Sequence, residues 1–138
     1  NHAWSDIDLD GDLDLLVGGR DTGGGRPNFL FKNEIGHQNR WVALRLEGDG
    51  MAVNRDAIGA RVTLNFTDRT LVREVQSSRG MYNSIDGRLL HIGLGDSPCN
   101  AEMVVRWPDG VIATFDASRL GQDRFWTIRY PDQLTEGL

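Results

Sequence analysis

The 138-residue chain is 39% hydrophobic and carries a formal net charge of −5, so it is long enough to bury one core. Five of its 20 acidic residues lie at positions 6–14, which leaves 15 acids against 15 bases elsewhere and gives no basic surface for nucleic acid. The only cysteine, Cys99, excludes an intrachain disulfide. No apolar run reaches the roughly 20 residues that span a bilayer, so no membrane insertion is predicted.

The first motif in the chain is Asp-Ile-Asp-Leu-Asp-Gly-Asp-Leu-Asp, with a carboxylate at every second position. Neighbouring carboxylates repel one another unless a cation holds them together. Ligands that are all oxygens select a hard ion, and a flexible loop with many ligands suits Ca²⁺ better than Mg²⁺. The sequence therefore predicts a Ca²⁺ site whose ligands are Asp6, Asp8, Asp10, Asp12 and Asp14.

The order of these residues resembles the start of an EF-hand loop. The first three aspartates take loop positions one, three and five, Gly11 makes the sharp turn at six, Asp12 offers its backbone carbonyl at seven, and Asp14 follows at nine. Position twelve, which requires a bidentate Glu, is Val17. The apolar residues after Asp14 indicate a strand and not a helix, so we expect a calcium loop that leads into β-structure.

Two apolar runs, Leu13–Val17 and Phe29–Phe31, flank the glycine-rich residues 21–27 and predict a β-hairpin. Together with the aspartate loop, residues 1–33 resemble an FG-GAP/VCBS-type repeat. Such repeats form the blades of integrin-α-like β-propellers and hold Ca²⁺ in a loop between two strands. One incomplete repeat cannot make a propeller. We therefore expect the chain to be the end of a longer secreted or cell-surface protein, with a signal peptide upstream.

From residue 40 onward the pattern is β throughout, with turn residues between short apolar runs. Only residues 117–122 could form a helical turn. We predict an all-β fold, a β-sandwich or distorted barrel of about seven strands, preceded by the calcium-loop hairpin. The polar residues 33–39 suggest a domain boundary, which gives a repeat remnant at 1–36 and a second domain at 37–138. The predicted strands are at residues 41–46, 58–66, 71–75, 89–94, 103–107, 111–115 and 125–130.

Four segments of the second domain resemble the ASPIC/UnbV domain. That domain typically follows FG-GAP/VCBS repeats at the C-terminus of secreted or surface proteins, and this chain has the same order. The resemblance implies fold, order and location, and it brings no established catalytic mechanism. The segments are Asn54–Val62, Arg79–Ser84, Arg88–Gly95 and Val105–Gly110.

A possible ligand surface is harder to place. Trp41 lies opposite Val42 and Leu44 in its strand, so we expect it to be exposed. His91 faces away from its apolar neighbours, although polar residues near turns usually satisfy backbone groups. The candidate residues for this surface are Trp41, Arg61, Tyr82, Arg88 and His91.

The function predicted from these features is a non-catalytic, calcium-binding extracellular module for adhesion or recognition of a protein or glycan. The alternative is a carbohydrate-binding module that uses Trp4, Trp41 or Tyr82 as a sugar platform. A hydrolase is least favoured. Ser84, Asp86 and His91 supply the residue types of a catalytic triad, but they lie within eight positions and lack a nucleophile-elbow signature.

Overall fold

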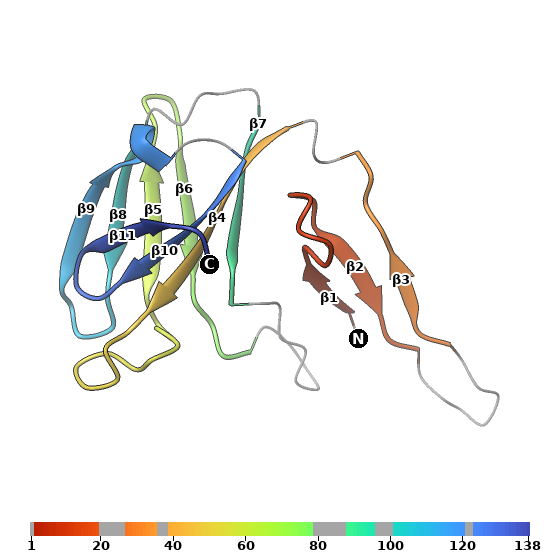
Figure 1. Cartoon of the computed structure of the whole chain (residues 1–138), viewed down its shortest axis with the longest axis horizontal. Helices are drawn as coiled ribbons and strands as arrows, with labels where there is room; N and C mark the ends of the chain where they lie inside the picture. The colour runs from red at the N-terminus through yellow and green to blue at the C-terminus, as the bar shows by residue number, and fades with distance from the viewer. Residues whose placement is uncertain (1, 20–26, 36–38, 79–87, 96–100, 121–122) are drawn as a thin grey trace. The chain divides into compact units, whose positions relative to one another are not determined.

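The computed structural model describes residues 2–19, 27–35, 39–78, 88–95, 101–120 and 123–138. The chain divides into two compact units, and the regular elements described in them are β-strands and one short 3-10 helix (Figure 1). The first unit comprises Asn1–Gln38 with Ser77–Gly87, and the second comprises Asn39–Gln76 with Arg88–Leu138. The all-β class predicted from the sequence is confirmed.

The first unit contains a three-stranded antiparallel sheet in the order β1-β2-β3, with strands at His2–Ser5, Asp14–Val17 and Phe29–Phe31. β2 and β3 form the predicted hairpin. Sequence analysis missed β1, because His-Ala-Trp-Ser contains no apolar run or clear alternation. It is a strand because it pairs with β2, which places Trp4 opposite Leu15.

Both faces of this small sheet carry exposed apolar side chains. Trp4 and Phe31 flank β2 on one face, since both are paired with Leu15. Leu16 and Leu30 are paired on the other face. The relative exposure of these side chains lies between 43% and 57%, apart from the half-buried Leu15. Sheets that are apolar on both faces are usually covered by other structural elements on both sides.

The second unit is a β-sandwich of two four-stranded sheets, in the orders β11-β10-β4-β7 and β6-β5-β8-β9. The predicted sandwich is confirmed, and the barrel alternative is not found among the described strands. One sheet consists of β4 (Arg40–Glu47), β7 (Leu90–Gly95), β10 (Arg124–Arg129) and β11 (Gln133–Glu136). The other consists of β5 (Arg61–Asn65), β6 (Thr70–Glu74), β8 (Glu102–Arg106) and β9 (Ile112–Asp116), after which the 3-10 helix η3 spans Ala117–Leu120.

Strand alternation places one dry face of each sheet toward a shared core. The described part of this unit holds eight strands and not seven, because the polar segment β11 gave no apolar signal yet pairs with β10. Burying each large aliphatic side chain contributes about 1.5–3 kcal/mol. The fully buried residues of the core include Val42, Leu44, Val62, Leu64, Ile92, Leu94, Met103, Val105, Trp107 and Ile128.

The strand predicted at residues 58–66 begins only at Arg61. Ala57 and Gly59 have positive φ angles of 52° and 92°, which an extended strand does not adopt. The Asn54 side chain stabilises this turn, because its oxygen accepts a hydrogen bond from the Ile58 amide at 2.8 Å and its NH₂ donates to the Ile58 carbonyl at 3.0 Å. The chain therefore turns here before β5 starts.

The Trp-Pro-Asp-Gly turn between β8 and β9 forms as predicted. The Trp107 amide donates to the Val111 carbonyl at 2.8 Å, and Gly110 takes a φ of 94°. The buried Trp107 indole donates to the Pro131 carbonyl at 2.8 Å. Its ring meets that of Tyr130 edge-on. The turn between β8 and β9 is thereby joined to the turn between β10 and β11.

Candidate functional site

The aspartate loop connects β1 to β2 and folds back on itself. Gly11 has a φ of 96°, in agreement with the sharp turn predicted there, and Leu9 also has a positive φ, of 61°. A leucine in the left-handed backbone region is unusual and marks a tightly constrained backbone. This fold brings Asp6, which directly follows β1, close to Asp14, which begins β2.

Asp6 and Asp14 are both buried, with relative exposures of 8% and 2%. Asp6 accepts hydrogen bonds from the amides of Asp10 at 3.1 Å and Gly11 at 3.0 Å.

Asp14 accepts hydrogen bonds from the amides of Ile7 at 3.0 Å and Asn33 at 2.9 Å. Through these bonds Asp14 ties the start of the loop to the segment after β3. An ionised carboxylate accepts about four hydrogen bonds, so bonds to two backbone amides do not by themselves exclude a metal ligand role.

One carboxylate oxygen from each of Asp6, Asp8 and Asp14 lies within 4.8 Å of the others. Oxygens that share a Ca²⁺ ion at 2.3–2.6 Å lie at most about 5 Å apart, so the spacing suits an ion placed between them. The donors are all carboxylate oxygens, which also suits a hard cation. Among the described residues, this is the only group of three or more acidic, histidine or cysteine side chains arranged in this way.

The side chains of the other two predicted ligands do not join this group. Asp10 is exposed, and its Oδ1 accepts a hydrogen bond from the Asp12 amide at 3.0 Å, which stabilises the turn. Asp12 is 2% exposed, and the loop position predicted for it uses its backbone carbonyl. The structure therefore brings together three of the five aspartates as a possible metal centre.

A lysine already lies against this cluster. Lys32 Nζ is 2.8 Å from Asp8 Oδ2 and 3.3 Å from Glu34 Oε1. The hydrogen bond from the Lys32 ammonium lowers the pKa of the Asp8 carboxyl below its usual value. The same bond to Asp8, followed by that to Glu34, raises the pKa of Lys32. Sequence analysis assigned no role to this lysine.

The prediction that Trp41 is exposed is wrong. Its relative exposure is 6%, because neighbouring strands cover the side of β4 that faces away from the core. The Trp41 ring stacks on His91 with centroids 5.5 Å apart and meets Phe125 edge-on at 5.0 Å. β4 is an interior strand of its sheet, and residues on the adjacent strands β7 and β10 supply this cover.

The remaining candidates for a ligand surface are dispersed. Arg88 forms an ion pair with Asp56. Arg61 lies on β5, in the other sheet of the sandwich from His91. Tyr82 lies outside the described residues, as do Ser84 and Asp86 of the disfavoured triad. Of the four candidates that the structure describes, Trp41 and His91 are in contact.

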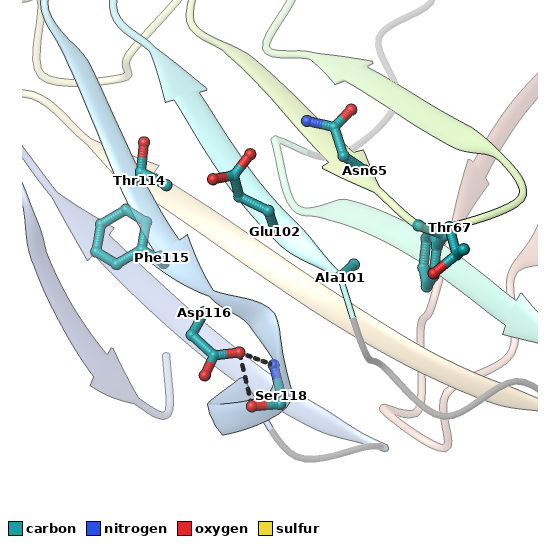
Figure 2. A pocket seen from close by; sticks show the side chains of 9 residues that line it. Asn65, Thr67, Ala101, Glu102, Thr114, Phe115, Asp116 and Ser118 are labelled. Carbon is teal, nitrogen blue, oxygen red and sulfur yellow. Dashed lines mark hydrogen bonds between the residues drawn. The ribbon is translucent and has the colours of Figure 1, made fainter.

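Sequence analysis missed a hollow on the sheet that contains β5, β8 and β9 (Figure 2). Strand register places Asn65, Glu102 and Asp116 side by side, with Asn65 on a strand distant in sequence from the β8–β9 hairpin that carries the two acids. Asp116 also accepts hydrogen bonds from the amide and hydroxyl of Ser118 at 3.0 and 2.6 Å. Only the topology could have revealed this site. Its lining residues are Asn65, Phe66, Thr67, Ala101, Glu102, Thr114, Phe115, Asp116 and Ser118.

The sequence of the sandwich matches a known protein family. Residues 50–135, more than half of the chain, match the model of the ASPIC and UnbV family. The chain belongs to this family. The matched ASPIC and UnbV region takes in β5–β10 and most of β11, and it leaves the aspartate loop and the first sheet outside. No curated protein matches the chain. Among the described residues, no helix has the length and apolar character needed to cross a membrane.

Proposed function

We propose that this chain is a non-catalytic, calcium-binding module of an extracellular protein, acting in adhesion or recognition. One Ca²⁺ ion is held by Asp6, Asp8 and Asp14. The observation that carries this proposal is the approach of three carboxylate oxygens to within 4.8 Å of one another. When bound, the ion offsets two of the loop's negative charges and ties β1 to β2, since its ligands lie after the first strand and at the start of the second.

The first unit is proposed to be an FG-GAP/VCBS-type repeat placed before the ASPIC and UnbV domain. Its apolar residues support this assignment, because Trp4 and Phe31 are exposed on one face of the sheet and Leu16 and Leu30 on the other. Such a sheet is suited to lie between two others, as the sheets of a propeller do. In that setting the calcium ion is a structural staple at one end of the sheet.

A structural role for the ion agrees with the donor set. Among the described residues, no histidine or cysteine joins the three aspartates. Asp6 and Asp14 are also engaged with backbone amides, which holds them in place. A group fixed in this way is suited to hold an ion as part of the fold, and none of the described histidines joins it to serve as a general base.

Recognition of a protein is favoured over recognition of a sugar as the role of the sandwich. Trp41, the best sugar platform in the sequence, is buried against His91 and Phe125. The face of Phe66, which lines the hollow, is covered by the Arg69 guanidinium at 4.7 Å from the ring centroid. A glycan array checks this choice, and binding that disappears in Trp4→Ala supports the sugar alternative.

Calorimetric titration of chelator-treated protein with CaCl₂ tests the metal centre. We expect one binding event with a dissociation constant on the order of 0.1–1 mM, as for extracellular modules. Ca²⁺ at 100 times its dissociation constant stabilises the folded state by about 2.7 kcal/mol. Asp8→Asn is the diagnostic variant, because Asp8 is exposed and its main hydrogen bond is to a side chain, that of Lys32.

The matched control is Glu102→Gln, which removes one acid from the hollow of the other unit. We expect Asp8→Asn to weaken Ca²⁺ binding by about tenfold or more, the loss of one charged ligand. Glu102→Gln should leave the affinity unchanged. Absence of both heat and a thermal shift in the wild type refutes the calcium centre. Equal Ca²⁺ affinity in Asp8→Asn and the wild type would mean that the ion binds at another site.

A further inference from the structure

Lys32 is the only lysine in the chain, and it projects its charge onto the proposed metal centre. It directly follows β3, which ends at Phe31. The next residue, Asn33, is fixed because its amide donates to Asp14 at 2.9 Å. The backbone that carries Lys32 is therefore tied to one proposed ligand, while its ammonium is hydrogen-bonded to another, Asp8.

The ammonium and a calcium ion compete for the same carboxylate. Lys32 Nζ lies 2.8 Å from Asp8 Oδ2, which is the distance of a strong charge-assisted hydrogen bond. A divalent ion bound to Asp8 would repel a cation at this distance, and the repulsion is only partly screened at a half-exposed site. One of the two cations must then give way or bind more weakly.

An alternative position for the ammonium is already present. Glu34 lies two residues after Lys32, and its Oε1 is 3.3 Å from Lys32 Nζ. Both side chains are largely exposed, with side-chain relative exposures of 51% for Lys32 and 72% for Glu34. A small rotation of the flexible lysine side chain could transfer its hydrogen bond from Asp8 to Glu34 without moving the backbone.

We propose that Lys32 is an internal counter-ion of the calcium centre: it neutralises Asp8 in the metal-free state and shifts toward Glu34 when Ca²⁺ binds. This inference rests on the proposed calcium site. Lys32 raises the Ca²⁺ concentration at which the site fills, so that the loop responds to the high Ca²⁺ levels found outside cells. It also keeps the metal-free loop from carrying five uncompensated charges.

Calorimetric titration of the whole chain with CaCl₂ tests this role. Lys32→Gln should bind Ca²⁺ about three- to tenfold more tightly than the wild type, the effect of removing one nearby positive charge and its ion pair. Lys32→Arg keeps the charge and should stay within about twofold of the wild type. Arg106→Gln removes one positive charge from the other unit, on β8, and should also leave the affinity unchanged.

A second measurement follows the lysine directly. The Nζ resonance of Lys32 is the only lysine signal in the spectrum, and we expect it to shift during the Ca²⁺ titration in the wild type but much less in Glu34→Gln. Glu34→Gln should also bind Ca²⁺ more weakly, because the displaced ammonium has lost its second partner.

Two outcomes separate this inference from the proposed function. If the wild type and Lys32→Gln bind Ca²⁺ with the same affinity, the calcium centre stands and the role of Lys32 is overturned. If neither protein binds Ca²⁺, the calcium centre itself fails. A Lys32 signal that does not move while Ca²⁺ binds also overturns the shift toward Glu34.

Discussion

The carboxylate of Asp14 should hold the first unit together even without a metal ion. Its two oxygens accept hydrogen bonds from the amides of Ile7 and Asn33, and its side chain is 2% exposed. Asp14→Ala leaves both amides without an acceptor. Each such loss costs about 1–3 kcal/mol when water cannot replace the partner, and these bonds are partly buried, so we take the lower value. The total is about 2 kcal/mol, or roughly a 30-fold increase in local opening.

Asp14→Asn separates the hydrogen bonds from the charge. Both variants remove the same negative charge, but the asparagine keeps one oxygen acceptor. We therefore expect an opening about fivefold greater than in the wild type, since one hydrogen bond is worth about 1 kcal/mol. Removing one negative charge also lowers the repulsion among the remaining aspartates. Experiments in 1 M NaCl, where the Debye length is about 3 Å, screen this repulsion and so suppress that effect.

The assay is amide hydrogen exchange followed by NMR on chelator-treated protein, read at Ile7 and Asn33. Asp10→Ala is the control, because Asp10 is exposed and accepts from the amide of Asp12 instead. It should leave exchange at Ile7 and Asn33 within about twofold of the wild type. Unchanged exchange at both amides in Asp14→Ala would refute the role assigned to this carboxylate.

Two further predictions concern the sandwich. A methyl group on Gly48 would lie 2.1 Å from the Asn54 carbonyl oxygen, so Gly48→Ala should lower the free energy of unfolding in urea by about 3 kcal/mol. Gly93→Ala, with no heavy atom within 4 Å, should change it by less than about 1 kcal/mol, and equal effects of the two would contradict this reasoning. The hydrogen bond that the Tyr130 hydroxyl donates to Asp109 raises the pKa of Tyr130. The stabilisation from this hydrogen bond is therefore present at pH values below the ordinary tyrosine pKa of about 10, and it is lost as the pH rises through the pKa of Tyr130 in the folded state. The difference in melting temperature between wild type and Tyr130→Phe should accordingly shrink only above pH 10.

Much of the sandwich follows from local signals in the sequence. The alternation in residues 41–46 predicts a strand, and Val42 and Leu44 are fully buried in it. The Trp-Pro-Asp-Gly segment predicts a turn, and Gly110 has the positive φ that such a turn requires. These features depend on residues close together in the chain, so the sequence alone is enough to find them.

The missed features depend on how strands pair with one another in the sheets. Trp41 has the alternation of an exposed residue, but its strand lies inside the sheet, where His91 and Phe125 from other strands cover it. The strands β1 and β11 are polar and become strands only through their partners.

The aspartate loop, too, could be predicted only in part from the sequence. Its composition suggested five ligands, and the backbone fold brings three of them together while Asp10 stabilises a turn. Lys32 gains its place beside Asp8 through the pairing of β2 with β3, which no local pattern near residue 32 could indicate.

The position of a calcium ion is the central claim, and carbon-13 NMR of the side-chain carboxyl groups during a Ca²⁺ titration tests it most directly. We predict that the carboxyl resonances of Asp6, Asp8 and Asp14 move together with one dissociation constant, while those of Glu102 and Asp116 in the hollow stay in place. Resonances of the three aspartates that remain fixed at 10 mM Ca²⁺, about tenfold or more above the expected dissociation constant, would contradict the account.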